Sequence, residues 1–194
     1  MAEAALMHVG QAGTYGVETI ENHGPQAAVL DHIRFVGLTP GLRILGPLAL
    51  HLRTRPGLPA LVAGLVRTFP PPHEGATVHP ISGFRVRPWR SWKDAAEMLI
   101  GFRPLRTGVL GYRALELHYH VGDRRYVTTL PDQLTVCAPY SFPLARCKAA
   151  RDQRRPRRVH SPGGGLGARL HDVRPEDPDR VSLCGRVLGG QGRA

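Results

Sequence analysis

Residues 114–121 read Ala-Leu-Glu-Leu-His-Tyr-His-Val, and this stretch decides the fold class. Apolar and polar residues alternate along it: Leu115, Leu117, Tyr119 and Val121 on one side, Glu116, His118 and His120 on the other. Successive side chains of a β-strand point to opposite faces, so this alternation predicts a half-buried strand. Gly122-Asp123 then supplies the residues that a tight turn prefers, and β-branched and aromatic residues follow over Arg125–Leu130. We therefore predict a β-hairpin.

Short segments of the same kind extend on both sides of this hairpin. The chain contains 23 Gly and 18 Pro, which break it into short pieces and favour strands joined by turns over long helices. The expected strands are Tyr15–Glu21, Ala28–Val36, Leu42–Leu45, Leu48–Leu52, 96–103 and Leu134–Cys137. Two alternatives stay open. Gly46-Pro47 either separates two short strands or interrupts one bent strand, and helix-forming residues allow a single helical turn within 96–103. This spacing predicts an all-β, antiparallel two-sheet sandwich.

Residues 14–147 resemble small immunoglobulin-like β-sandwich domains of unknown function on extracytoplasmic or membrane-anchored proteins of high-GC bacteria. The resemblance rests on Tyr15–Asn22, Gly24 and Ala28–Asp31, and on Leu115–Gly122 running to Val136-Cys137. It implies an immunoglobulin-like sandwich outside the cytoplasm. Tyr112 precedes the central strand and also suggests a tyrosine corner, in which the hydroxyl bonds back to the backbone. The alternative is an ordinary half-buried aromatic residue.

Charge and composition divide the chain into three parts. We expect a flexible segment over 1–13, the sandwich over 14–147 and a disordered tail over 148–194, because the tail is rich in Arg, Gly and Pro and poor in aromatic residues. The formal net charge is +11, of which +5 lies in residues 1–147 and +6 in the tail. The tail's basic cluster comprises Arg151, Arg154, Arg155, Arg157 and Arg158. No aromatic residue is interleaved to stack on bases, so we expect a solvated tail rather than specific nucleic-acid recognition.

The apolar stretches and the first residues of the chain bear on where the protein is located. No apolar stretch reaches the roughly 20 residues of a membrane span, because arginines interrupt the best candidate. The first residues, Met-Ala-Glu-Ala-Ala-Leu, also lack the pattern of an export signal. A domain that begins on a strand near Tyr15 is compatible with an anchor encoded upstream of Met1. We expect an extracytoplasmic or membrane-anchored protein, with a cytoplasmic location as the alternative.

Three cysteines are present: Cys137, Cys147 and Cys184. Cys137 ends the last expected strand, and Cys147 follows a loop containing two prolines that we expect to be non-helical and able to fold back. A disulfide between Cys137 and Cys147 would contribute about 2–3 kcal/mol and would require an oxidising compartment. The alternative is a pair of free thiols in the cytosol. Cys184 has no evident partner.

Two histidines are the candidate metal ligands. His118 and His120 share one face of the central strand, so both imidazoles reach one ion if a third ligand such as His32, His51 or His79 joins them. The alternative is the exposed polar face of an amphipathic strand. Nucleophile elbows, phosphate-binding loops and dinucleotide fingerprints are absent from the sequence in their required context. Asp31, Glu116 and Asp132 are scattered, so no carboxylate pair is expected, and we predict neither a catalytic site nor a cofactor.

These observations favour a non-enzymatic interaction or structural domain of the cell envelope. Its partner would be a protein or another envelope component of unknown identity. One alternative is a nucleic-acid-associated protein that acts through residues 151–158. Another is a metal-binding carrier that uses His118 and His120.

Overall fold

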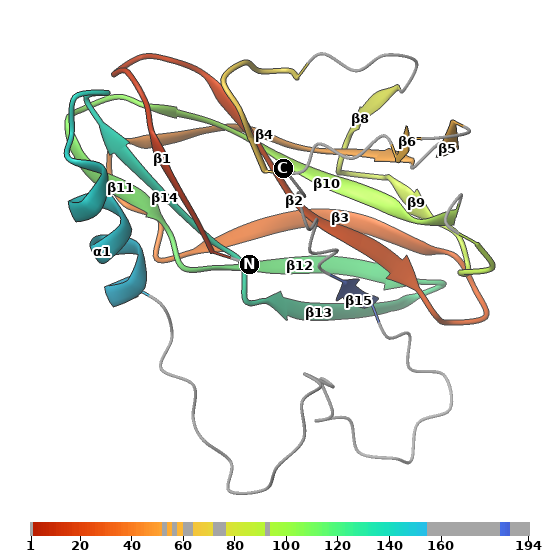
Figure 1. The fold of residues 1–194 in the computed structure, drawn as a ribbon. Coiled ribbons are helices and arrows are strands. Elements are labelled where there is room, and N and C mark those ends of the chain that lie inside the picture. Colours follow the sequence, from red (N-terminus) through yellow and green to blue (C-terminus); the bar gives the residue numbers. More distant parts are fainter. Residues whose placement is uncertain are drawn as a thin grey trace, which may run out of the picture.

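The computed structural model describes residues 2–51, 54–55, 58–59, 64–71, 77–91, 94–154 and 183–186. The fold is all-β, with stacked sheets in a sandwich-like arrangement and one short helix (Figure 1). The strands are β1 Ala2–Leu6, β2 Gly13–Asn22, β3 Ala28–Val36, β4 Leu42–His51, β5 Thr54–Arg55, β6 Leu58–Pro59, β7 Gly64–Val66, β8 Val78–Pro80, β9 Arg85–Val86, β10 Ala96–Pro104, β11 Gly108–Tyr112, β12 Ala114–Val121, β13 Arg124–Leu130, β14 Gln133–Ala138 and β15 Leu183–Arg186. The helix is α1, Leu144–Arg154.

Two large sheets form the layers of the sandwich. One has the order β13-β12-β3-β9, and the other has the order β15-β2-β10-β4-β8 with β7 also on β2. A third sheet, β1-β14-β11, lies at one end, and β5 and β6 form a small ribbon. Figure 1 shows β12, β13 and β3 beneath β10 and β4. Among the strand pairs that the structure describes, only β1 with β14 is parallel.

The core lies between the two large sheets. Leu115, Leu117 and Tyr119 of β12 are at most 4% exposed, which confirms the predicted alternation along this strand. The facing strand β10 contributes Met98, Ile100 and Phe102, each fully buried. β12 and β13 form the predicted hairpin. Gly122 lies in its turn at φ 54°, a conformation that glycine adopts readily.

The structure resolves the two open choices of secondary structure. Residues 96–103 belong to strand β10, which pairs with β2 on one side and β4 on the other. Pairing on both sides outweighs the local preference of its alanines for a helix. Residues 42–51 form the single strand β4, whose ladder with β10 shifts register between Gly101 and Phe102. Leu45 is the residue left unpaired by this shift, so the bend is absorbed as a β-bulge.

Two predicted boundaries are wrong. Residues 1–13 are not wholly flexible, because β1 pairs with β14 and places Ala5 and Met7 in buried positions. The domain does not end at 147, and the loop before Cys147 is partly helical, because α1 begins at Leu144 directly after Pro143 and runs to Arg154. Leu, Ala, Arg, Lys and Gln dominate α1 and are all strong helix formers.

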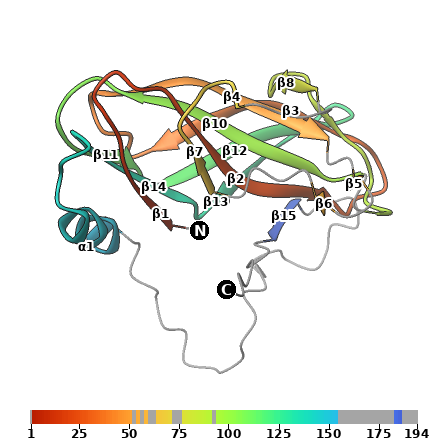
Figure 2. The same ribbon diagram turned by 45° about the horizontal axis from the view of Figure 1, so that its top comes forward.

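The predicted tail is therefore ordered at two places. Residues 148–154 complete α1, and β15 pairs antiparallel with β2. The remainder of the expected tail, 155–182 and 187–194, lies outside the described residues. Figure 2 shows α1 beside β1 and β14, at the end of the molecule opposite the hairpin of β12 and β13.

Candidate functional site

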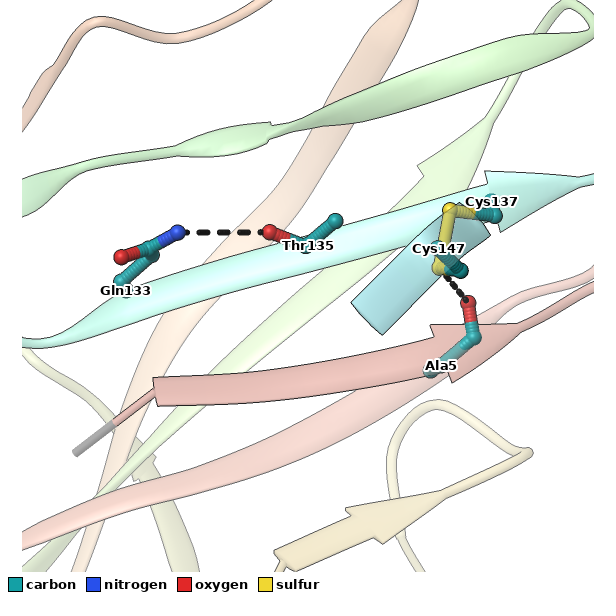
Figure 3. The surroundings of a disulfide bond; sticks show 5 residues. All are labelled: Ala5, Gln133, Thr135, Cys137 and Cys147. Atoms are coloured by element: carbon teal, nitrogen blue, oxygen red, sulfur yellow. Dashed lines mark hydrogen bonds between the residues drawn. A yellow bond between two sulfur atoms is a disulfide. The ribbon is translucent and has the colours of Figure 1, made fainter. Parts of the chain in front are cut away.

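A disulfide joins Cys137 at the end of β14 to Cys147 in α1, as the cysteine spacing indicated (Figure 3). The two Cα atoms are 5.9 Å apart, and both residues are fully buried. Cys147 Sγ also lies 3.8 Å from the carbonyl oxygen of Ala5 in β1. A disulfide sulfur carries no hydrogen, so this approach is a packing contact. The bridge thus lies at the junction of β14, β1 and α1.

A polar side chain provides a second connection between α1 and β14. Gln133 is 1% exposed, and its Nε2 donates to the carbonyl oxygen of Arg151 at 2.8 Å. Gln133 Nε2 also donates to Thr135 Oγ1, at 3.5 Å. Figure 3 draws this hydrogen bond as a dashed line. The helix is therefore held near both ends, by Cys147 in its first turn and by Arg151 in its last turn. This attachment is what extends the domain beyond the boundary predicted from composition.

The candidate metal ligands lie on the outer face of β12, opposite β3. His118 pairs with His32, and the two imidazole rings stack with centroids 4.1 Å apart. His120 Nδ1 lies 2.8 Å from Asp31 Oδ1. The ladder shifts register here, so Asp31 is an extra residue and projects outward beside His32. Of the three proposed additional histidines, the structure brings His32 to this face.

An ion pair continues the same row of side chains. Arg34 donates through Nε and Nη2 to the two carboxylate oxygens of Glu116, each at 2.6 Å. Glu116 Oε2 is also 4.0 Å from His118 Nε2, a buried nitrogen that makes no hydrogen bond to any residue that the structure describes. Within the described ranges, no group of three or more His, Cys, Asp or Glu side chains is placed to hold a metal ion. This face is a cross-strand row of paired polar side chains.

His51 and His79 lie elsewhere. Their rings flank Phe84, with centroids 4.6 Å and 5.9 Å from its centroid. They line an open hollow of about 290 Å³ together with Ser82 and Arg85. These two histidines therefore do not join His118 and His120.

The three carboxylates considered as a possible pair point to different environments. Asp31 and Glu116 face outward, whereas Asp132 is fully buried and accepts hydrogen bonds from the hydroxyls of Tyr15 at 3.1 Å and Tyr112 at 3.4 Å. The Tyr112 hydroxyl, which the sequence suggested for a tyrosine corner, thus contacts the carboxylate of Asp132. Sequence reasoning missed this buried network, although Tyr15 on an expected strand next to apolar residues was the available signal.

The predicted basic cluster begins on α1. Arg151 is held against its neighbour, with Nε 2.9 Å and Nη2 2.8 Å from Asp152 Oδ1. Arg154 ends the helix. Arg155, Arg157 and Arg158 lie outside the described residues.

Comparison with protein-family models, curated proteins and solved structures gives no match for this chain. In the part of the chain that the structure describes, no helix has the length and apolar character needed to cross a bilayer.

Proposed function

We propose that this chain is a non-enzymatic interaction or structural domain that acts outside the cytoplasm, as a component of the cell envelope. We further propose that its sandwich is immunoglobulin-like, as the resemblance of residues 14–147 implies. One observation supports the proposed location above the others: the buried disulfide between Cys137 and Cys147.

The disulfide supports the compartment because thiols in reducing compartments stay reduced. Disulfides form and persist mainly in secreted, periplasmic and surface proteins. Both cysteines here are fully buried, so the bridge is shielded from the thiolates that would exchange with it. A shielded bridge between a strand and the only helix in the described residues has a structural role, which fits a domain that must survive without cytoplasmic chaperones.

The outer face of β3 and β12 supports an interaction role. Arg34 engages Glu116, and Asp31 engages His120, so this face carries polar side chains and charges of both signs. They lie on an open sheet surface rather than around a closed pocket. Such a surface provides complementary charges for a partner, which mainly set specificity and association rate.

Protease accessibility in intact cells tests the proposed location. The full-length chain, with an epitope tag at its C-terminus, is expressed in a bacterial host together with any upstream coding sequence that is in frame. Spheroplasts are then treated with a protease that does not cross the inner membrane. We expect the tagged chain to be cleaved while a cytoplasmic marker stays intact. A chain that survives until the spheroplasts are lysed would contradict the proposal.

A further inference from the structure

Exposed apolar side chains gather at one end of the molecule. Among the described residues, six large apolar side chains are strongly exposed. Five of them lie in or beside the loops at one end: Val9 (43%), Leu38 (39%), Leu105 (52%), Tyr140 (44%) and Leu144 (45%). The sixth, Val127 (56%), lies on strand β13, away from this end. Five apolar side chains concentrated in this way suggest a contact surface.

Four loops form this end, and hydrogen bonds and ring contacts connect them. We call residues 8–11, 37–41, 105–107 and 139–143 the loop end. Gly10 N donates to the carbonyl oxygen of Pro104 at 2.7 Å, and Leu105 N donates to that of Gly41 at 2.8 Å. The rings of His8 and Tyr140 stack with centroids 5.1 Å apart. In Figures 1 and 2, these loops lie together at the left, above and beside α1.

The loop end is also basic. Arg43 and Arg103 lie at the ends of the strands that enter it, and the side chain of Arg106 lies across Gly41. Arg67 contacts the ring of Tyr140, with Cζ 5.2 Å from its centroid. No Asp or Glu occurs in residues 7–12, 37–43, 103–113 or 138–146. The surface therefore presents arginines among apolar tips, with no carboxylate in the same loops.

Among the described residues, two of these arginines face each other across neighbouring strands rather than facing a carboxylate. Arg43 and Arg103 are directly opposite each other in the antiparallel ladder of β4 and β10. Like charges in this position repel, and a pair of this kind destabilises a sheet. The Nε atom of Arg103 is buried and has no hydrogen-bond partner in the described structure. An anion placed between the two guanidinium groups would relieve the repulsion and satisfy this donor.

We propose that the loop end docks on an anionic lipid bilayer. In this arrangement the five apolar tips enter the boundary between headgroups and acyl chains, and the arginines contact lipid phosphates. The apolar tips favour a bilayer over a nucleic acid, because a phosphate backbone offers aliphatic side chains no apolar environment. The inference deepens the proposed function by naming the envelope component that the domain contacts.

Sedimentation of the full-length chain with vesicles tests the docking surface. Vesicles of phosphatidylcholine alone are compared with vesicles that contain phosphatidylglycerol at 30 mol%, at about 0.1 M salt. We expect binding to the anionic vesicles and little binding to the neutral ones. Arg43→Glu with Arg106→Glu should weaken binding about thirtyfold or more, since each basic group near the surface contributes about a factor of five. The matched control is Arg85→Glu with Arg125→Glu, two exposed arginines near the opposite end that give the same change in net charge.

The apolar tips are tested separately. Leu38→Ser with Leu105→Ser should weaken binding to the anionic vesicles about tenfold, because two exposed leucines lose their insertion into the bilayer. Val127→Ser removes an even more exposed apolar side chain outside the loop end and should leave binding unchanged. Both arms use the full chain, so binding through other basic segments would be insensitive to these substitutions.

Several outcomes would overturn the inference. One is that the chain does not bind anionic vesicles. Another is that the loop-end variants and their controls lose binding equally. A third is that the chain binds DNA and not vesicles, and that the arginine substitutions abolish the DNA binding. If the chain self-associates, does not bind vesicles, and loses self-association in the variant Leu38→Ser with Leu105→Ser, the surface contacts a second copy of the chain instead. Vesicle binding is measured on purified protein, so a chain that binds vesicles but resides in the cytoplasm would refute the proposed location and leave this inference standing.

Discussion

Removal of the disulfide is the most quantitative test of how this domain is stabilised. The perturbation is the double substitution Cys137→Ala with Cys147→Ala. The bridge closes a loop with a sequence separation of 10 residues. In the chain-entropy model a loop of this length restricts the unfolded state by about 2.7 kcal/mol at 25 °C. Domains of this size are commonly stable by only about 5–15 kcal/mol, so the expected loss is a substantial fraction of the total.

The assay is urea unfolding of the full chain, followed by circular dichroism in the absence of reductant. The double variant should unfold with a free energy about 2–3 kcal/mol below that of the parent. Cys184→Ala removes the cysteine outside the bridge and is the matched control, which should change stability by less than about 0.5 kcal/mol. Hydrogen exchange should also show that amides of α1 lose more protection than amides of β10, because Cys147 holds α1 while β10 is paired on both sides. A double variant within about 0.5 kcal/mol of the parent, with α1 still protected, would refute this reasoning.

Three further substitutions test other features of the fold. Asp132→Ala should lower the free energy of unfolding by about 2–4 kcal/mol, because the buried hydroxyls of Tyr15 and Tyr112 each lose their hydrogen bond to this carboxylate. A loss below about 1 kcal/mol would contradict the buried network. Gly111→Ala should prevent stable folding, since φ is +155° and a Cβ atom would lie 2.0 Å from the backbone oxygen of Leu134, and an unchanged melting temperature would exclude this close approach. Glu116→Gln should cost less than about 1 kcal/mol in urea unfolding, because its partner Arg34 is 67% exposed; a larger loss would show that the ion pair is shielded from solvent.

Strands that carry their own pattern were predictable from sequence. β12 alternates strictly, and its hairpin with β13 depends on a turn of two residues, so both signals are local. β1 was missed because Ala-Glu-Ala-Ala-Leu has no strand pattern, and its conformation comes from pairing with β14, far away in sequence. α1 was missed because its helix-forming residues adjoin a long Arg- and Gly-rich stretch whose composition dominated the prediction.

The same distinction separates the predicted and the missed parts of the candidate sites. The disulfide was predictable because Cys137 lies in the last expected strand and Cys147 follows it after a short loop that can fold back. The partner of His120 was not, because Asp31 reaches it through a bulge in the ladder of β3 and β12. The loop end could not be predicted from any local pattern. Its four loops are distant in sequence and meet because the strands that they connect end at the same end of the sandwich.

Trapping of thiols in living cells tests the central claim most directly. Cells that express the full-length chain are quenched with acid, and free thiols are alkylated with a maleimide-polyethylene glycol reagent before and after reduction. We expect one modified cysteine per chain before reduction and three after it, because Cys137 and Cys147 are joined and Cys184 is outside the bridge. Three modified cysteines before reduction would show that the bridge does not form in the cell and would contradict the proposed extracytoplasmic location.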